Sequence, residues 1–301
     1  MMAVDAARAA PVIIVNPISG GHRSANEIAG RVALARRCAG ARAEVYVTAG
    51  RGHATALARA AVERGTPLVI AWGGDGTINE VGLALAFGPA ALGIVPAGSG
   101  DGLARELGIP ASPEQALEVA LHGRERRIDA GELGGRLFFN VAGVGVDAWI
   151  AHRFNTGQPG ERRGLLRYLS LAARAGLEYS PRALAVSVNG DPVEAARPYL
   201  LTIANSRQFG NRARVAPHAR MDDGQLDLVV VQGRSAGQAS WRLRGLLGRG
   251  LEPGAGVSFT PASEVRIDSD APIDFHVDGE PVHGGSSLVA RVHPGALTVR
   301  C

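Results

Sequence analysis

The chain of 301 residues is 46% hydrophobic and 20% charged, which is typical of a soluble globular protein long enough for two domains. Its formal net charge of +4 suits nucleotide phosphates or an anionic membrane face, whereas the absence of arginine-rich runs interleaved with aromatic residues argues against nucleic acid. The two cysteines lie outside any paired or metal-type motif, which argues against disulfides. Residues 1–10 lack the apolar core of a signal peptide, and residues 81–100 are broken by glycine and proline and so do not form a membrane span. These features predict a cytoplasmic protein.

The first part of the chain alternates apolar, strand-like runs with helical segments. This alternation predicts a parallel, doubly wound α/β sheet. The predicted strands are 11–15, 44–47, 68–71 and 91–95, and the predicted helices are 24–37, 53–64, 77–86 and 113–122.

From residue 127 onward, short apolar runs separated by turn residues replace this pattern. Their spacing predicts an all-β domain, an antiparallel sandwich, and the change of pattern divides the chain into domains 1–125 and 126–301. A basic amphipathic helix, predicted at 161–178, either covers one side of the sandwich or lies on an anionic membrane. The predicted strands are 127–132, 137–141, 184–188, 199–204, 226–231, 264–267, 273–277, 288–292 and 297–300.

The segment from Trp72 to Val81, Trp-Gly-Gly-Asp-Gly-Thr-Ile-Asn-Glu-Val, joins a predicted strand to a predicted helix. Its three glycines let the backbone turn sharply and lie against a ligand, and the N–H groups of the helix start favour an anion such as phosphate. Asp75 beside a phosphate requires a bridging divalent cation, so the segment indicates a magnesium–nucleotide site. Taken alone, it could equally be a tight turn with a solvated aspartate.

Two further glycine-rich loops follow predicted strands: 16–23, Asn-Pro-Ile-Ser-Gly-Gly-His-Arg, and 95–105, Val-Pro-Ala-Gly-Ser-Gly-Asp-Gly-Leu-Ala-Arg. Loops at the carboxyl ends of parallel strands meet at one sheet edge, where open α/β sheets bind ligands. Three such loops therefore favour the nucleotide site. The chain contains no lysine and no Gly-x-Gly-x-x-Gly in its first crossover, which excludes a Walker A loop, a protein-kinase lysine, a lysine Schiff base and a dinucleotide fingerprint.

Five motifs in order along the chain resemble the diacylglycerol kinase catalytic-domain family, which holds bacterial lipid kinases together with sphingosine and ceramide kinases. Gly-Gly-Asp-Gly alone is shared with NAD kinases and phosphofructokinases, but the order of five motifs is far more specific. The motifs are Asn16-Pro17-x-Ser19-Gly20-Gly21, Gly73-Gly74-Asp75-Gly76-Thr77-x-Asn79-Glu80, Pro96-Ala97-Gly98-Ser99-Gly100, Asp222-Asp223-Gly224-x-Leu226-Asp227 and Val277-Asp278-Gly279-Glu280.

The resemblance implies an ATP-binding domain at residues 1–125, a lipid-binding β-sandwich at residues 126–301 and ATP in the cleft between them. ATP and Mg²⁺ are the implied cofactors. The positions expected to contact the nucleotide are Asn16, Thr48, Gly73, Gly74, Asp75, Gly76, Thr77, Asn79, Gly98, Ser99 and Glu280.

The same resemblance makes Asp278 the residue that takes the proton from the lipid hydroxyl, with Glu280 near nucleotide or metal. Asp75 is the competing base or a metal ligand. Plainer interpretations stay open on spacing alone: Asp278-Gly279 as a hairpin turn, Thr48 as a cap for the helix predicted to start at 53, and Glu80 as a charge at a helix N-terminus.

A structural divalent ion is also implied, bound by the side chain of Asp223 and the carbonyl oxygens of Arg220 and Gln225. The eight histidines show no metal-binding spacing and are interpreted as structural or surface residues. Asp101-Gly102 replaces the Asn-Asp of many bacterial members. This change keeps the acceptor but removes the amide donors, and it leaves the metal contacts and the lipid identity open.

The sequence therefore predicts an ATP-dependent lipid kinase that contacts the membrane peripherally and does not bind nucleic acid. The acceptor is diacylglycerol or a related lipid: a sphingoid base, ceramide or phosphatidylglycerol. A non-catalytic nucleotide or lipid sensor and an NAD kinase-like phosphotransferase remain as alternatives, and whether the chain forms a homodimer stays open.

Overall fold

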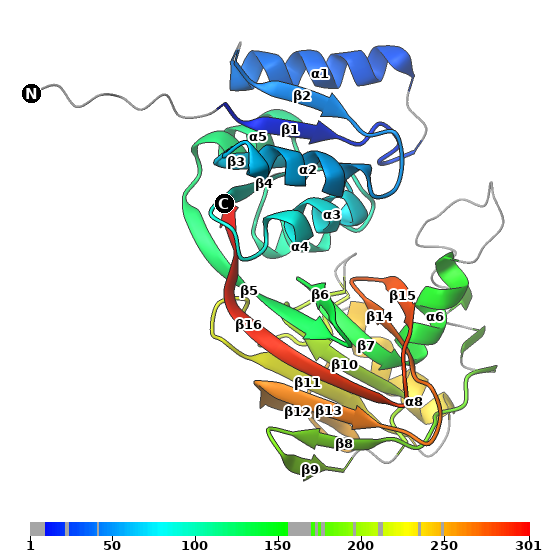
Figure 1. Cartoon of the computed structure of the whole chain (residues 1–301). Coiled ribbons are helices and arrows are strands. Elements are labelled where there is room, and N and C mark those ends of the chain that lie inside the picture. Colours follow the sequence, from blue (N-terminus) through cyan, green and yellow to red (C-terminus); the bar gives the residue numbers. More distant parts are fainter. Residues whose placement is uncertain are drawn as a thin grey trace, which may run out of the picture. The chain divides into compact units, whose positions relative to one another are not determined.

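The structure, a computed structural model, describes residues 10–21, 24–40, 42–155, 170–171, 174–175, 178–194, 197–209, 213–233, 236–247 and 250–301. The chain forms two compact units (Figure 1). The first comprises Met1–Ile128 together with Gly295–Cys301, and the second comprises Asp129–Pro294.

The first unit is built on a parallel sheet in the order β2-β1-β3-β4, followed by the end of β16. Residue pairs such as Val15 with Trp72 and Val299 with Leu92 fix its register. Every residue of β1 and β3 is buried, as expected for parallel strands covered on both faces. The strands are β1 Val12–Val15, β2 Glu44–Val47, β3 Leu68–Gly73, β4 Ala91–Pro96 and β16 Ser287–Arg300.

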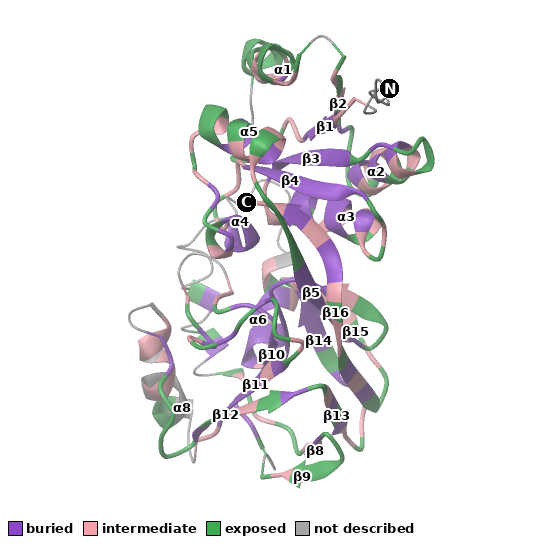
Figure 2. Ribbon diagram, turned by 90° about the vertical axis from the view of Figure 1, so that its left-hand side faces the viewer, coloured by how far each residue is buried: buried purple, intermediate pink, exposed green. Residues whose placement is uncertain are grey.

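Five helices connect these strands. α1 packs with α5 and α2 packs with α3, and Figure 2 shows the two pairs on opposite faces of the sheet. A capping box between Ser24 and Glu27 begins α1, and Ser112 caps α5 with Pro113 in its first turn. The helices are α1 Ala25–Ala39, α2 His53–Glu63, α3 Asp75–Leu85, α4 Gly102–Glu106 and α5 Pro113–His122.

The second unit contains two layers of antiparallel strands. One is a six-stranded sheet in the order β12-β11-β10-β7-β14-β15. The other places β16 beside β13, followed by β8 and β9; β5 also pairs with β16, and β6 pairs with β5. The strands are β5 Glu125–Leu133, β6 Arg136–Phe138, β7 Val141–Gly145, β8 Ala185–Val188, β9 Asp191–Val193, β10 Leu200–Ala204, β11 Leu226–Val231, β12 Val257–Ala262, β13 Glu264–Asp268, β14 Asp274–Val277 and β15 Glu280–His283.

Apolar side chains from both layers form one core, which includes Phe138, Leu201, Ile267 and Phe275. A second core lies on the other face of the six-stranded sheet, where α6 (Val146–Asn155) packs against β14 and β15. Helix α8 (Ala236–Leu243) and a 3₁₀ helix (Arg244–Leu247) follow β11 in the chain. The α/β unit followed by a β-sandwich confirms the predicted fold class.

The predicted helix at 161–178 falls largely on residues 161–169, which lie outside the described residues. The described positions near its end, Ser170, Leu171, Arg174, Ala175 and Glu178, are helical. Leu171 and Ala175 are buried in the second core, so this part of the helix covers the sandwich.

Three strand predictions are wrong in their bounds. The run 137–141 is split between β6 and β7, which belong to different sheets, because the chain changes layers at Phe139 and Asn140. The runs 288–292 and 297–300 are one continuous strand, β16, which passes through Pro294-Gly295 without ending.

Among the described residues, no helix combines the length and the apolar character that crossing a membrane would require.

Candidate functional site

The three glycine-rich loops of the first unit are hydrogen-bonded to one another at the carboxyl ends of β1, β3 and β4. The side-chain amide of Asn16 donates to Thr77 Oγ1 at 2.8 Å, and the backbone N–H of Gly74 donates to Ser19 Oγ at 3.1 Å. The Arg31 guanidinium of α1 donates to the Asn16 carbonyl at 3.2 Å. The predicted meeting of the loops at one sheet edge is therefore present within this unit.

Close packing between the loops explains several of their glycines. A Cβ on Gly98 would lie 2.8 Å from the Gly74 Cα, and a Cβ on Gly73 would lie 2.5 Å from the Thr77 Cβ. A Cβ on Gly100 would lie 2.5 Å from Asp75 Oδ2. All three distances are shorter than a real Cβ contact allows, so larger residues would force the loops apart.

The carboxylate of Asp75 holds the third loop in place. Its Oδ2 accepts the Asp101 N–H at 2.9 Å and its Oδ1 accepts the Gly102 N–H at 2.6 Å, at the start of α4. Each carboxylate oxygen can accept a further bond, so Asp75 can also ligate a metal ion. The sequence did not indicate that Asp75 holds the third loop, because the two N–H donors lie 26 and 27 residues away.

The N-terminus of α3 is open to solvent. The Gly74 carbonyl accepts the N–H groups of Thr77 and Ile78, and within residues 42–155 no side chain caps this helix. Gly76 and Ser99 are exposed, and a Cβ on Gly76 would meet no atom within 4 Å. The first N–H groups of α3 and the space around Gly76 fit a phosphate group.

Thr48 and Asn79 occupy positions near this edge, and Thr48 does not have the capping role considered above. Thr48 is buried after β2, and the N-cap residue of α2 is Gly52, so Thr48 does not cap that helix. Asn79 is half-buried and lies just past the first turn of α3.

Glu80 lies in the second turn of α3, not the first, and binds the start of a different helix, α2. Its two carboxylate oxygens accept the N–H groups of Gly52 at 2.9 Å and Ala54 at 3.2 Å. The interpretation of Glu80 as a charge for its own helix is therefore incomplete: it serves as the N-terminal cap that α2 lacks.

Asp101 is the residue that departs from the usual motif. It has a left-handed backbone (φ 47°), and its Oδ1 accepts the Gly98 N–H at 2.9 Å. Burial raises the pKa of the Asp101 carboxyl, and the nearby negative charge of Asp75 raises this pKa further. The hydrogen bond from the Gly98 N–H acts in the opposite direction and lowers it. A carboxyl at this position is therefore costly to ionise.

A pocket of about 370 Å³ lies beside the same strand ends. It is lined by Arg31 and Leu34 of α1, Trp72 at the end of β3, Pro96 at the end of β4, and Ala97. The Arg31 guanidinium lies 5.7 Å from the centre of the Trp72 ring. This volume falls within the range of small-molecule sites, which run from about 300 to 1,000 Å³.

In the second unit, Asp278 and Gly279 form the two-residue turn between β14 and β15, with φ of 47° and 83°. The hairpin interpretation of this pair is thus correct. The Asp278 carboxylate also accepts three backbone N–H groups from the point where the chain changes sheets: Phe139 at 2.8 Å, Asn140 at 2.9 Å and Val141 at 3.0 Å. These bonds fix the carboxylate and stabilise its negative charge.

A buried polar chain that the sequence analysis missed leads to this turn. Asp147 Oδ2 on α6 lies 3.3 Å from His276 Nε2 and accepts the Thr202 hydroxyl at 3.1 Å. The Gly279 N–H donates to His276 Nδ1 at 3.3 Å, so Nδ1 is the acceptor and Nε2 carries the proton toward Asp147. A Cβ on Gly143 would lie 1.9 Å from Asp147 Oδ2, and this close approach explains the glycine.

The remaining predicted residues also lie in the second unit. Glu280 is half-buried at the start of β15, opposite Val277. Asp223 and Gln225 are exposed in one loop, where Asp223 Oδ1 accepts the Gln225 N–H at 3.1 Å.

Two further carboxyls belong to this loop region. Asp129 is buried and accepts the Gly224 N–H at 2.8 Å. Burial raises the pKa of Asp227, and the charge of Asp223 adds to it. The exposed Arg220 pairs with Asp222 at 3.6 Å. Oxygen atoms suited to a divalent cation are therefore present in this loop, and its role as a metal site stays a prediction.

Comparison with known proteins extends over nearly the whole chain. Residues 10–133 match the family model of the diacylglycerol kinase catalytic domain, and residues 140–301 match that of the YegS C-terminal NAD kinase β-sandwich-like domain. A Chromohalobacter salexigens protein named "Probable lipid kinase YegS-like" is 33% identical over 300 residues, which cover 95% of this chain and 91% of that protein.

Two further similarities concern proteins named as diacylglycerol kinases. The diacylglycerol kinase of Bacillus subtilis is 30% identical over 285 residues, covering 91% of this chain and 89% of that protein. A crystal structure of a diacylglycerol kinase from Bacillus anthracis matches with a TM-score of 0.73 and 19% identity over 97% of this chain and 96% of that one. At this identity the structural match supports the fold alone.

Proposed function

We propose that this chain, which belongs to the diacylglycerol kinase family of lipid kinases, transfers the γ-phosphoryl group of ATP to a lipid hydroxyl. The observation that carries the proposal is the set of three interlocked glycine-rich loops around the open N-terminus of α3. In this proposal residues 1–125 bind the nucleotide and residues 126–301 bind the lipid.

Backbone groups and arginine must hold the phosphates, because the chain has no lysine. The first N–H groups of α3, near Gly76, are the proposed donors to phosphate. The Ser99 hydroxyl is a further proposed donor, because Ser99 follows Gly98, which packs against Gly74 at the start of α3. Mg²⁺ would neutralise phosphate charge, and Asp75 is the residue proposed to hold it. Asn16, Thr48, Gly73, Gly74, Thr77, Gly98 and Asn79 are proposed to shape this site, and Glu280 is proposed as a further nucleotide contact.

In the transfer step, the lipid hydroxyl oxygen forms a bond to the γ-phosphorus while the bond from that phosphorus to the β,γ-bridging oxygen breaks. ADP leaves with the electron pair, and the hydroxyl proton passes to Asp278. Three N–H donors make Asp278 a well-oriented but weak base. A weak base suffices, since positioning and charge stabilisation dominate phosphoryl transfer. Asp75, whose carboxylate orders α4, is better suited to metal binding than to proton transfer.

Diacylglycerol is the first candidate acceptor, because a relative that is 30% identical carries that name. A sphingoid base, ceramide and phosphatidylglycerol are the other acceptors to test. A lipid acceptor entails peripheral contact with a membrane. The loop with Asp223, and the carbonyls of Arg220 and Gln225, are proposed to bind a structural divalent ion.

The test is phosphoryl transfer from γ-labelled ATP, with Mg²⁺, to these four lipids in mixed micelles. Wild type is expected to label one lipid, and Asp278→Asn is expected to abolish labelling while still binding ATP. Asp191→Asn, an exposed change of the same type in β9, is the matched control and should label the lipid like wild type. No transfer to any lipid despite ATP binding would contradict the kinase proposal.

One observation favours a second candidate, a non-catalytic nucleotide or lipid sensor. The carboxylates of both Asp75 and Asp278 are bound by backbone N–H groups, as structural aspartates are. ATP binding that changes lipid-vesicle affinity without any transfer would support the sensor. Label transferred to NAD in the same assay would instead support the NAD kinase-like alternative.

A further inference from the structure

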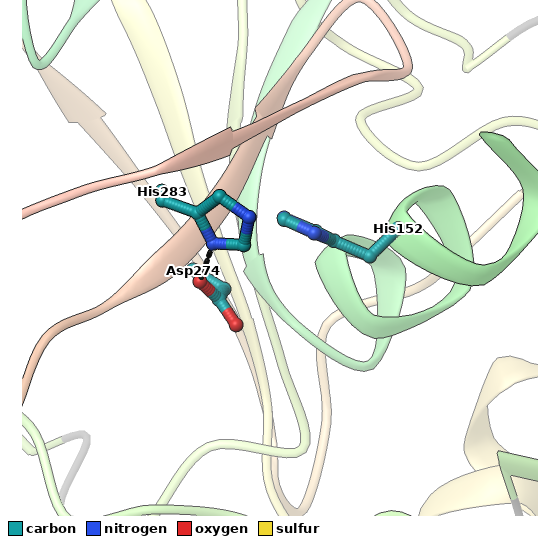
Figure 3. A group of neighbouring side chains, drawn as sticks. All are labelled: His152, Asp274 and His283. Atoms are coloured by element: carbon teal, nitrogen blue, oxygen red, sulfur yellow. Dashed lines mark hydrogen bonds and ion pairs between the residues drawn. The ribbon is translucent and has the colours of Figure 1, made fainter. Parts of the chain in front are cut away.

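The second unit carries a cluster of two histidines and one aspartate that the proposed kinase chemistry does not use: His152, Asp274 and His283 (Figure 3). One ligand atom from each residue lies within 4.8 Å of the others. Figure 3 shows the two imidazole rings directed toward each other, one from α6 and one from the β14–β15 hairpin.

The fold explains why residues so far apart in sequence meet. Asp274 and His283 are directly opposite each other in the β14–β15 hairpin, so their side chains project from the same face. His283 Nδ1 lies 2.7 Å from Asp274 Oδ1. His152 lies near the end of α6, which packs on both strands, and its ring centre is 4.8 Å from that of His283.

The same helix and hairpin are already fixed to each other at a second, buried point. Asp147 in the first turn of α6 contacts His276 of β14, and both side chains are buried. This contact holds the backbones that carry the cluster. The side chains of Asp274 and His283 are 56% and 83% exposed, so they can rotate while the backbone stays in place.

We propose that His152, Asp274 and His283 form a binding site for a divalent transition metal of the zinc class. Two imidazole nitrogens and one carboxylate oxygen are the ligands that Zn²⁺ takes at about 2.0–2.2 Å, in a tetrahedron whose ligand atoms are roughly 3.4 Å apart. No two ligand atoms therefore have to approach by more than about 1.4 Å from the 4.8 Å limit, and His283 Nδ1 and Asp274 Oδ1, which lie 2.7 Å apart, would separate by about 0.7 Å. Side-chain rotation supplies both changes.

The donor set distinguishes this site from the sites considered for magnesium. Imidazole favours zinc, copper or nickel, whereas Mg²⁺ prefers oxygen ligands. Three protein ligands leave the fourth position to water. His152 and Asp274 also line a cavity of about 150 Å³ with Trp149, Tyr179 and Leu184, so a small ligand has room beside the metal.

A bound metal would tie α6 to the hairpin whose turn is Asp278-Gly279. Its expected effect is to stabilise the second unit and to reduce the motion of that turn. The site itself does not depend on kinase activity, so its test is a binding measurement. The competing explanation is an exposed Asp274–His283 ion pair that lies beside His152 and binds nothing.

The experiment is titration of the metal-free full chain with Zn²⁺ by calorimetry, followed by melting curves with and without Zn²⁺. We expect one equivalent to bind and to raise the melting temperature. His152→Ala, Asp274→Asn and His283→Ala should each weaken binding at least about tenfold. His122→Ala removes an exposed histidine in α5 of the other unit and should leave binding unchanged.

Two measurements keep the result interpretable. In EDTA, His283→Ala should melt like wild type, because this side chain is largely exposed. Co²⁺ in place of Zn²⁺ should give the visible absorption of a tetrahedral site without a thiolate charge-transfer band. A thiolate band would assign the metal to Cys38 or Cys301 and overturn the proposal, as would weak binding or binding that the three variants leave unchanged.

Discussion

The three backbone bonds to Asp278 make a quantitative prediction for Asp278→Asn. The variant keeps the turn, because Asn-Gly is a preferred pair for a two-residue hairpin turn in which both residues have positive φ. It replaces a charged acceptor by a neutral amide. One amide atom can still accept the N–H groups of Asn140 and Val141, but the NH₂ group now faces the Phe139 N–H.

Losing a charge-assisted bond and leaving one buried N–H without an acceptor costs about 2–4 kcal/mol. We therefore expect Asp278→Asn to lower the melting temperature by about 4–16 °C, since each kcal/mol corresponds to roughly 2–4 °C at this size. Hydrogen exchange should quicken at the amides of Phe139, Asn140 and Val141. The exposed control Asp191→Asn should change stability by less than about 0.5 kcal/mol.

Equal stability of Asp278→Asn and wild type, with unchanged exchange at these three amides, would refute the reasoning. The carboxylate would then not anchor the change of sheet. The result also governs how the activity assay is interpreted: loss of transfer in Asp278→Asn identifies a base only at a temperature where the variant is folded.

Four further variants test the first unit. Gly98→Ala places a Cβ against the Gly74 backbone, so it should lower the free energy of unfolding by about 1–3 kcal/mol and weaken ATP binding. The Cβ of Gly76→Ala enters open space, so this variant should weaken ATP binding and leave stability unchanged. Calorimetry measures the binding, and melting curves measure the stability. Glu80→Gln keeps only one carbonyl oxygen at the start of α2 and should destabilise the chain by about 1 kcal/mol in urea unfolding. Burial in the fold raises the pKa of Asp101, so the protonated carboxyl stabilises the folded chain fully below the ordinary pKa of about 4, and this stabilisation is lost as the pH rises through the raised pKa. The stability of Asp101→Asn relative to wild type should therefore increase between pH 4 and 7. A stability difference that stays constant over this range would contradict the argument.

The sequence predicts the first unit well because its signals are local. β2 and α5 begin and end at the predicted residues, and β3 extends the prediction by two. Buried parallel strands are continuous apolar runs, and Ser112-Pro113 is a strong helix start. The order of five motifs also predicted the family, which the two family models and the relatives confirm.

The sequence fails in the second unit where pairing overrides local preference. Pro294-Gly295 signals a break, but β16 continues through it. β12 was missed because Pro261 and two polar residues interrupt it, and α6 was missed because it starts directly after Gly145 without a capping residue.

The three glycine-rich loops of the first unit contact one another as predicted, but the individual contacts were not predictable, and the roles of the site residues stay predictions. Asp278 binds residues 137–139 positions earlier, and His152 meets Asp274 and His283 only through the packing of α6 on the hairpin. Spacing rules for histidines detect ligands on one helix or loop, so they cannot detect this cluster.

The continuity of β16 has a consequence for how the chain folds during synthesis. The first unit is interrupted in sequence: Asp129–Pro294 is an insertion between Ile128 and Gly295. The segment that follows the insertion completes this unit: Val299 pairs with Leu92 of β4, the Ala296 carbonyl accepts the Phe87 N–H, and the Arg300 guanidinium donates to the Leu121 carbonyl. Ala296, Val299 and Arg300 leave the ribosome after the whole inserted unit. The first unit, although its synthesis begins first, is therefore completed last, and a fragment ending at residue 128 would expose the unpaired edge of β4.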